Sequence, residues 1–446
     1  MANILPFKGI RYNPEKITDF SKVITPPYDV ISDDERENYY QLHPNSIIRL
    51  ILGKDLPGDN DSTNKYTRAA DFFGSWRNDE VLIQETEPAI YVYAQEFTLE
   101  NKKYTRKGII SLVKLEDFKT GRIYPHEHTL AKPKEDRLKL MQSCDANFSQ
   151  VFAFFEDNDC KVSGILNNKG GPNTGIPPEI DFTDIYGVRN ILWPIRDKEI
   201  LRELMSLMEQ KPLFIADGHH RYETALFYRD YVKGLNQSAK DANDNSHSPP
   251  DYLMMMSVPM NDPGLIILPT HRLVKNINNI KAETIIDSLN EVFEVKDMGQ
   301  DCRTESLMHE LSKNINEHAF ILYIGEEEKR FYSLKVRDKA VLHKIFEDEF
   351  SEWKSIDTGI LHGFILDKIL GLKAENTSKS ENIKYLQGVE DAVTLVNEDK
   401  YQLAFFLNPT RIEQIRDIAI KRHKMPPKAT YFYPKLMTGM VLRHIS

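Results

Sequence analysis

The sequence predicts an α+β fold of the mixed α/β type, and three observations support this. An apolar run ends at Asp217, Gly218 follows, and an amphipathic segment begins soon afterwards, which is typical of a strand, a tight turn and a helix. Two β-rich runs flank a polar stretch at residues 100–103 and predict a hairpin. From residue 276 onward helical and strand patterns alternate, so we expect a second α/β part there.

The expected elements follow the apolar periodicity of the chain. Before residue 275 we expect helices at 66–77 and 222–232, strands at 89–94, 107–113, 151–155, 213–216, 252–258 and 265–268, and loops at 167–178 and 234–250. After it we expect helices at 282–293 and 340–353 and strands at 319–324 and 403–407. Because 446 residues can build two or three cores, we expect two domains, 1–275 and 276–446.

The composition is that of a globular protein, with 41% hydrophobic and 28% charged residues. A net charge of −9 argues against general nucleic-acid binding. The cysteines Cys144, Cys160 and Cys302 are far apart, fit no zinc motif and predict reduced thiols. Neither a signal peptide nor an apolar run of membrane-spanning length is evident, so we expect a cytoplasmic protein with no membrane partner.

The turn after the strand at 213–216 is the strongest candidate site. Asp217, Gly218, His219, His220 and Arg221 place a carboxylate, two imidazoles and a guanidinium where a helix begins. Free backbone N–H groups and the positive end of the helix dipole favour anions there, and an arginine can grip phosphate with two parallel hydrogen bonds. The alternative is that these residues have structural roles alone, with Asp217 as a helix cap, Arg221 as a salt-bridge partner and the two histidines as polar surface. Four polar groups in one turn favour a phosphate site.

A second polar cluster places Glu127 between His126 and His128. On a strand the two histidines would share one face, and in a loop all three side chains could converge. The pattern is not that of a zinc protease. Residues 132–137 are densely charged and form either a solvated turn or part of a site.

Three other segments carry candidate residues. Two prolines precede Asp29 and predict a rigid extended turn that could position its carboxylate, or a strand start with an Asx turn. His271 and Arg272 end an apolar strand. A proline-rich and aromatic stretch carries Lys428 and Lys435, and it could cover a nucleotide or pack against the core.

Five ordered motifs resemble the bacterial and archaeal family called domain of unknown function 1015. They are residues 25–31, 126–129, 217–225, 268–272 and 425–435. The resemblance covers nearly the full chain, although the family label gives no activity. The turn at 218–222 also resembles the ParB and sulfiredoxin superfamily, whose members bind nucleotide phosphates with a Gly-x-x-Arg turn at a helix N-terminus.

The second resemblance implies a ParB/sulfiredoxin-like phosphate-binding core within 1–275. Its free serine kinases phosphorylate the hydroxyl of L-serine from a nucleotide, and the first family is associated with serine biosynthesis. Sulfiredoxin chemistry is disfavoured because His219 and His220 stand where that activity uses a cysteine. DNA segregation of the ParB type is disfavoured by the acidic charge and by the lack of a helix-turn-helix pattern.

These resemblances imply phosphotransfer on a small hydroxylated metabolite, serine or phosphoserine, with magnesium and ATP or ADP as expected cofactors. The alternatives are a phosphoserine phosphatase that uses the same pocket and a ParB-like nucleotide-binding regulatory protein without turnover. A phosphohistidine intermediate is a further possibility. The sequence leaves open the reaction direction, the nucleotide, any metal ligands and the oligomeric state.

The roles expected of the candidate residues divide into two groups. A carboxylate must accept the hydroxyl proton or position water. Glu127 comes before Asp29 and Asp217 as the candidate because His126 and His128 flank it, and His126 is itself a catalytic candidate. The residues expected to bind phosphate or nucleotide are Gly218, His219, His220, Arg221, His271, Arg272, Lys428 and Lys435.

Overall fold

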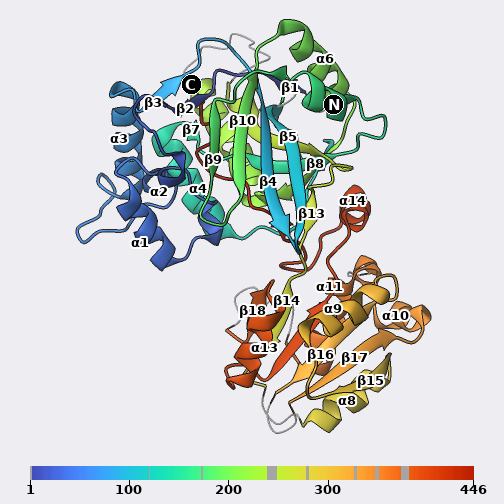
Figure 1. Cartoon of the computed structure of the whole chain (residues 1–446). Helices are drawn as coiled ribbons and strands as arrows, with labels where there is room; N and C mark the ends of the chain where they lie inside the picture. Colours follow the sequence, from blue (N-terminus) through green and yellow to red (C-terminus); the bar gives the residue numbers. More distant parts are fainter. Residues whose placement is uncertain are drawn as a thin grey trace. The chain divides into compact units, whose positions relative to one another are not determined.

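The structure is a computed structural model that describes residues 3–119, 121–171, 174–238, 249–277, 281–325, 329–346, 351–372 and 381–445 (Figure 1). Contacts within the chain define two compact units. Unit 1 comprises Met1–Pro125, Thr129–Ile266 and Pro434–Ser446, and unit 2 comprises His126–His128 and Ile267–Tyr433. The expected division into domains at residue 275 stays a prediction.

Unit 1 is built on a mixed nine-stranded sheet in the order β6-β11-β8-β12-β5-β4-β10-β9, with β1 paired to β5. The pairs β11–β6 and β12–β8 are parallel, and the remaining pairs are antiparallel. The strands are β1 (Ile4–Leu5), β4 (Ile90–Leu99), β5 (Lys102–Lys114), β6 (Ile123–Tyr124), β8 (Val151–Phe155), β9 (Ile180–Thr183), β10 (Arg189–Ile195), β11 (Leu213–Asp217) and β12 (Tyr252–Pro259).

The predicted hairpin is confirmed as β4 and β5, which are joined by a tight turn at Glu100 and Asn101. Both turn residues have positive φ, of 49° and 62°, and such a left-handed pair matches the twist of a two-residue hairpin. The expected strands at 151–155, 213–216 and 252–258 are also confirmed as β8, β11 and β12. Strands β8 and β12 are buried along their whole length, which explains their continuous apolar runs.

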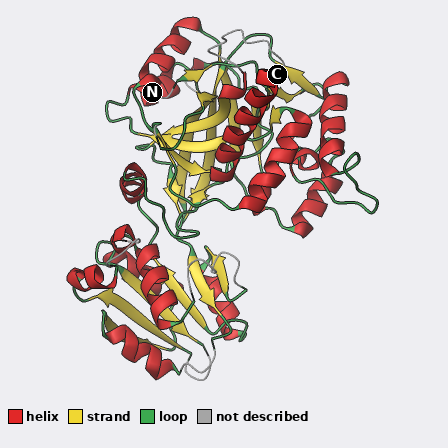
Figure 2. Cartoon of the chain, turned by 180° about the vertical axis from the view of Figure 1, so that it is seen from behind, coloured by secondary structure: helices red, strands yellow, loops and turns green. Residues whose placement is uncertain are grey.

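Four helices of unit 1 share one hydrophobic core with the sheet. They are α4 (Ala131–Cys144), α5 (Lys161–Asn168), α6 (Lys198–Glu209) and α7 (His219–Ser238). Figure 2 shows helices and strands of this unit from behind. The charged residues 132–137, for which a turn was one expectation, lie in the first turns of α4. Helix α4 packs against α7 and against α3 (Lys65–Asn78). The bounds of α3 confirm the helix expected at 66–77.

The remaining elements of unit 1 are short. They are β2 (Ile10–Tyr12), η1 (Phe20–Lys22), η2 (Tyr28–Val30), α1 (Asp33–Leu42), α2 (Ile48–Ile51), β3 (Leu82–Gln84), β7 (Ala146–Asn147), η4 (Pro249–Asp251) and β21 (Arg443–His444). Strand β2 pairs with β3, and β21 pairs with β7.

The segment Pro434–Ser446 is bound into unit 1 by buried polar groups. The Nε2 of Gln95 donates to Lys435 O at 3.0 Å. The buried guanidinium of Arg106 donates to Pro434 O at 2.5 Å, and burial lowers its pKa to about 10. Near the end of the segment, Arg443 donates to the carbonyls of Tyr252 and Pro249.

Unit 2 is built on a six-stranded antiparallel sheet in the order β15-β17-β16-β19-β14-β18. Successive residues of its strands enter two different cores, so that Phe320 and Leu322 pack on one face and Ile321 and Tyr323 on the other. The strands are β14 (His271–Val274), β15 (Phe293–Gly299), β16 (Ala319–Ile324), β17 (Arg330–Val336), β18 (Ile383–Leu386) and β19 (Leu403–Leu407).

Helices cover both faces of this sheet, since α8 (Ala282–Asn290) contributes to one core and α9 (Thr304–Lys313) and α13 (Val389–Asn397) to the other. The other elements are α10 (Lys339–Ile345), η5 (Ser351–Ser355), α11 (Asp357–Ile360), the π-helix η6 (Leu361–Ile369), α14 (Ile412–Ile420) and β20 (Phe432–Tyr433). The short strand β13 (Ile266–Ile267) spans the change from unit 1 to unit 2.

Two helix predictions in unit 2 are wrong at their C-terminal ends. The helix expected at 282–293 ends at Asn290, because buried Phe293 begins β15 and pairs with Val336. The helix expected at 340–353 ends at Ile345 as α10, and residues 347–350 lie outside the described part of the chain. Residues 239–248 of the expected surface loop also lie outside it.

Within the described residues, no helix combines the length and the apolar character needed to cross a bilayer.

Two glycines of unit 1 provide a matched test of its packing. A methyl group at Gly108 of β5 would lie 2.7 Å from Ser257 O and 2.7 Å from a Val258 methyl group, so Gly108→Ala should force β5 and β12 apart. We expect a loss of about 1–3 kcal/mol in the free energy of unfolding. Gly74→Ala in α3 meets no atom within 4 Å and should gain about 0.5–1 kcal/mol as a helix former. Urea unfolding measures the free energy of unfolding of both variants. An unchanged value for Gly108→Ala would contradict the close packing of β5 against β12 at this position.

Candidate functional site

The turn between β11 and α7 has a backbone that requires glycine. Gly218 has a φ of +91°, a region in which other residues are strained. A methyl group at this position would also lie 2.8 Å from Arg221 Nη2 and 2.9 Å from its Nε. The glycine therefore leaves space for the Arg221 guanidinium to fold back over the turn, while Tyr222 N donates to Gly218 O at 3.0 Å and closes the first helical hydrogen bond.

The guanidinium of Arg221 is held by neutral acceptors. Its Nη1 donates to Gln150 O at 2.6 Å and to Ser149 Oγ at 3.1 Å. Among the described residues, no carboxylate forms an ion pair with Arg221, and no acceptor bonds its Nε or Nη2. A cation in the first turn of a helix opposes the helix dipole. A bound anion would satisfy both the guanidinium and the helix terminus.

A cavity of about 60 Å³ opens beside this guanidinium. Arg221, Arg137, Tyr28, Ser149 and Thr438 contribute to its lining. One water needs roughly 10–15 Å³ by the same measure, so the cavity has room for a few waters or for a group of similar size. Residues with two guanidiniums, two hydroxyls and a phenol thus line, together with apolar side chains, a space that fits one small oxyanion.

Arg137 differs from Arg221 because a carboxylate compensates its charge. Its Nε donates to Asp136 Oδ2 at 2.9 Å, and its Nη1 donates to Ile51 O at 2.9 Å. The guanidinium lies over the Tyr28 ring, 3.9 Å from the centroid. Burial raises the pKa of Tyr28, an effect that Arg137 opposes and Asp29 reinforces, so the phenol stays protonated at neutral pH.

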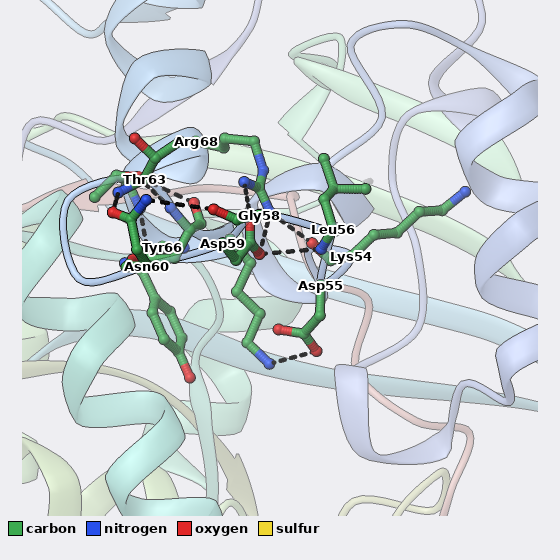
Figure 3. Close-up of polar contacts among 12 residues, drawn as sticks. Lys54, Asp55, Leu56, Gly58, Asp59, Asn60, Thr63, Tyr66 and Arg68 are labelled. Carbon is green, nitrogen blue, oxygen red and sulfur yellow. Dashed lines mark hydrogen bonds and ion pairs between the residues drawn. The ribbon is translucent and has the colours of Figure 1, made fainter.

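The loop that joins α2 to α3 is held by side chains at the start of α3 (Figure 3). Arg68 holds this loop by bonding both carboxylate oxygens of Asp59, at 2.6 Å and 2.9 Å, and by donating to Lys54 O at 2.8 Å. Two residues earlier in α3, Tyr66 Oη donates to Asp136 Oδ1 at 2.8 Å. The first turns of α3 therefore hold both this loop and the carboxylate that orients Arg137.

Asp217 and Lys435 meet at the end of β11. Lys435 Nζ lies 3.2 Å from Asp217 Oδ2, and Asp217 Oδ1 accepts from Gly218 N at 2.9 Å. The two residues are 218 positions apart in the sequence. The structure thus brings together Asp217, Gly218, Arg221 and Lys435, four of the residues selected from the sequence.

The two histidines of the turn differ in exposure and contacts. His219 is buried, with 2% of its surface exposed. His220 is half-buried, and its Nε2 accepts from Leu130 N at 2.9 Å, which ties the turn to the residue before α4. Asp29 lies exposed in η2, next to the cavity residue Tyr28.

The remaining candidates lie in unit 2. His126 is buried in a loop, and its Nε2 lies 3.2 Å from Thr430 Oγ1 and 3.9 Å from Glu127 Oε1. Residues 126–128 lie in a loop and not on a strand, and convergence of all three side chains stays a prediction. Glu127 is partly exposed.

His271 and Arg272 are both fully buried in β14. Burial, and then the neighbouring Arg272, lower the pKa of His271 to about 3. Arg272 donates to Thr270 O and, at 3.0 Å, to Lys428 O, while the Lys428 side chain is exposed. A role of these three residues in phosphate binding stays a prediction.

The sequence did not indicate that four residues of the cavity belong to one site. Tyr28, Arg137, Ser149 and Thr438 come from η2, α4, the segment before β8 and the C-terminal segment. The charge density around Arg137 was a usable signal, whereas nothing local marks Ser149 or Thr438. Among the described residues, no group of three or more His, Cys, Asp or Glu side chains is placed to hold a metal ion.

Comparison with known proteins places the chain in a sequence family. The model of a family described as "Protein of unknown function (DUF1015)" matches residues 4–358. No curated protein matches the chain.

Several solved structures resemble the chain distantly. A free serine kinase in complex with AMP is 12% identical, with a TM-score of 0.34 over 73% of this chain and 86% of that one. A conserved hypothetical protein from Pyrococcus furiosus is 13% identical, with a TM-score of 0.33 over 74% and 93%. SbnI from Staphylococcus aureus, with a C-terminal truncation, is 9% identical, with a TM-score of 0.33 over 74% and 85%. Likenesses at this level assign neither substrate nor activity to this chain.

The geometry of the turn predicts that Gly218→Ala costs more than backbone strain alone. Any residue other than glycine at such a φ should lose about 1–2 kcal/mol in the free energy of unfolding. The added methyl group should also displace the Arg221 guanidinium from Gln150 O, for a further loss of about 1–3 kcal/mol.

Gly187→Ala is the control, because Gly187 has a φ of +79° in the same unit and no atom lies within 4 Å of the added methyl group. Urea unfolding of both variants measures the difference. Equal losses would show that the guanidinium does not depend on the space at Gly218.

Proposed function

The chain belongs to the DUF1015 family, whose description states no activity, and we propose that unit 1 binds a phosphate group at the β11–α7 turn and transfers it to or from a small hydroxylated metabolite. One observation carries this proposal. Arg221 is a partly buried cation at a helix N-terminus that no carboxylate among the described residues pairs with. An oxyanion in the neighbouring cavity would supply the missing charge.

The chemistry follows from what phosphoryl transfer needs. Its transition state spreads negative charge over the equatorial oxygens, and preorganised cations and N–H groups stabilise that charge. Arg221 would bind the phosphoryl oxygens with Nε and Nη2, while Tyr28 and Arg137 would complete the cavity. The size of the cavity supports binding of one phosphoryl group rather than a whole nucleotide.

A carboxylate would accept the proton of the attacking hydroxyl group. Within unit 1, Asp217 adjoins the turn, and its ion pair with Lys435 would hold the carboxylate in place to accept the proton. Glu127 and Asp29 remain candidates for the same role. Magnesium would arrive with a nucleotide donor, bound mainly through the phosphates and one carboxylate.

Serine and O-phosphoserine are the substrates to test first, because the Gly-His-His-Arg turn resembles that of free serine kinases. The protein would be incubated with L-serine, magnesium and ATP or ADP, and separately with O-phosphoserine alone, and followed by ³¹P NMR. Phosphoserine formed only with nucleotide would support the kinase direction. Phosphate released without nucleotide would support a phosphatase, and tight nucleotide binding without product would favour a regulatory protein and contradict the transfer.

Arg221→Ala should lower turnover by about a hundredfold to a thousandfold, the usual cost of removing one donor that stabilises transition-state charge. Arg229→Ala is the control, since Arg229 lies on the same helix and is paired with Asp230 at 2.8 Å. The control should retain turnover. An unchanged turnover rate in Arg221→Ala would contradict the proposal that Arg221 binds the transferred phosphoryl group.

Asp217→Asn, Glu127→Gln and Asp29→Asn test which carboxylate accepts the proton. Loss of a general base typically lowers kcat by about 10²–10⁴-fold, with a smaller effect on KM. We expect this loss in Asp217→Asn, measured by steady-state kinetics across pH. If only Glu127→Gln loses kcat, the base lies on unit 2, and if none does, the base is another group.

A further inference from the structure

Unit 2 contains a second pocket, to which neither the sequence motifs nor the family description gives a role. Its volume is about 310 Å³, within the range of small-molecule sites. Its lining includes Lys339, Lys354, Arg411, His343, His318 and Asp357. All of these residues belong to unit 2. Arg411 and other lining residues after residue 358 also lie beyond the segment that the family model matches.

Each of the three permanent cations is positioned by a neutral acceptor. Lys339 Nζ donates to Asn316 O at 3.1 Å, and Arg411 Nη1 donates to Asn316 Oδ1 at 2.6 Å. Lys354 Nζ lies 2.9 Å from His343 Nδ1, and because an ammonium group can only donate, this nitrogen must be the unprotonated acceptor. The side chains are thus held in place without losing their positive charge.

Among the described residues, none of these three cations forms an ion pair. Other basic residues of unit 2 do, as in the pairs Lys335–Glu317 at 3.0 Å and Lys421–Glu352 at 2.8 Å. The carboxylate in the lining, Asp357, is bonded to His318 Nδ1 at 2.8 Å. The pocket therefore concentrates uncompensated positive charge in a chain whose net charge is −9.

Backbone groups add to this charge. Arg411 is the N-cap of the nine-residue helix α14, and Arg411 and Gln414 both line the pocket, so the pocket lies beside the positive end of this helix. His318 adopts a φ of +52°, an uncommon conformation for a residue other than glycine, and its imidazole is fixed by Asp357. Clustered cations, a helix terminus and an oriented imidazole together suit a multiply charged oxyanion.

We propose that this pocket is a binding site for a small molecule that carries phosphate, either inorganic phosphate or pyrophosphate or a phosphate ester. Lys339, Lys354 and Arg411 bind the phosphate oxygens. His318, whose Nδ1 is bonded to Asp357, forms a hydrogen bond to the ligand with its Nε2. The proposal does not rest on the function proposed for unit 1.

The test measures binding of inorganic phosphate and pyrophosphate to the full chain by isothermal titration calorimetry. Arg221→Ala is present in every sample, so that the unit 1 turn does not contribute. The pocket variant adds Lys339→Gln and Arg411→Gln. The control adds Lys313→Gln and Lys384→Gln, which remove the same charge from exposed positions of unit 2 outside the pocket.

We expect the control to keep its affinity within about twofold and the pocket variant to lose about tenfold for each cation removed, a typical effect of one charge-assisted hydrogen bond. A phosphate ester that outcompetes pyrophosphate would identify an ester as the ligand. Equal affinities in the pocket variant and the control, or no binding in the control, would overturn the proposal.

Two further measurements exclude a folding defect as the cause. The conservative variant, with Lys339→Arg and Arg411→Lys, should recover most of the affinity and match the control in its unfolding temperature. Hydrogen exchange should show phosphate-dependent protection in residues 316–318, 339–343 and 354–357. Protection confined to other segments would contradict the site.

Discussion

The β11–α7 turn of unit 1 depends on one unfavourable electrostatic interaction, because the positive guanidinium of Arg221 lies at the positive end of the α7 dipole. Neutral acceptors and the space at Gly218, rather than a carboxylate among the described residues, hold this guanidinium in place. Gln150 O and Ser149 Oγ draw Nη1 toward the segment that leads into β8, and the missing side chain at Gly218 allows the guanidinium to fold back. The acceptors directly precede β8 and the donor follows β11, and these two strands are neighbours in one sheet. The sheet therefore determines where an anion would be stabilised.

Much of this fold could be predicted from local pattern, and the failures have identifiable causes. Strands β8, β11, β12, β16 and β19 lie where apolar runs predict them, because strands buried on both faces leave a continuous signal in the sequence. The helix predicted at 282–293 was too long because apolar Phe293 continues the helical pattern while pairing with Val336 in a sheet. That pairing partner lies far along the chain, where local periodicity gives no information.

The candidate site could be predicted in part. The turn at Gly218 was recognisable because its glycine, cation and carboxylate are adjacent in sequence. The contact between Asp217 and Lys435 joins distant positions, so the sequence suggested both residues without their pairing. Ser149 and Thr438 are ordinary residues that acquire a role only through the cavity they share with Arg221.

The connectivity of the two units has a consequence for how the chain folds as it leaves the ribosome. Apart from His126–His128, unit 2 is inserted between Ile266 and Pro434. The final segment of unit 1 supplies acceptors for Arg106 and Gln95, the lysine that pairs with Asp217, and strand β21. Unit 1 must therefore wait, with Arg106 lacking its Pro434 acceptor, while all of unit 2 is synthesised. During translation unit 2 can complete its sheet first, although most of unit 1 emerges earlier. A premature stop after residue 433 would retain all of unit 2 but would leave unit 1 without these acceptors, the Asp217–Lys435 ion pair and β21.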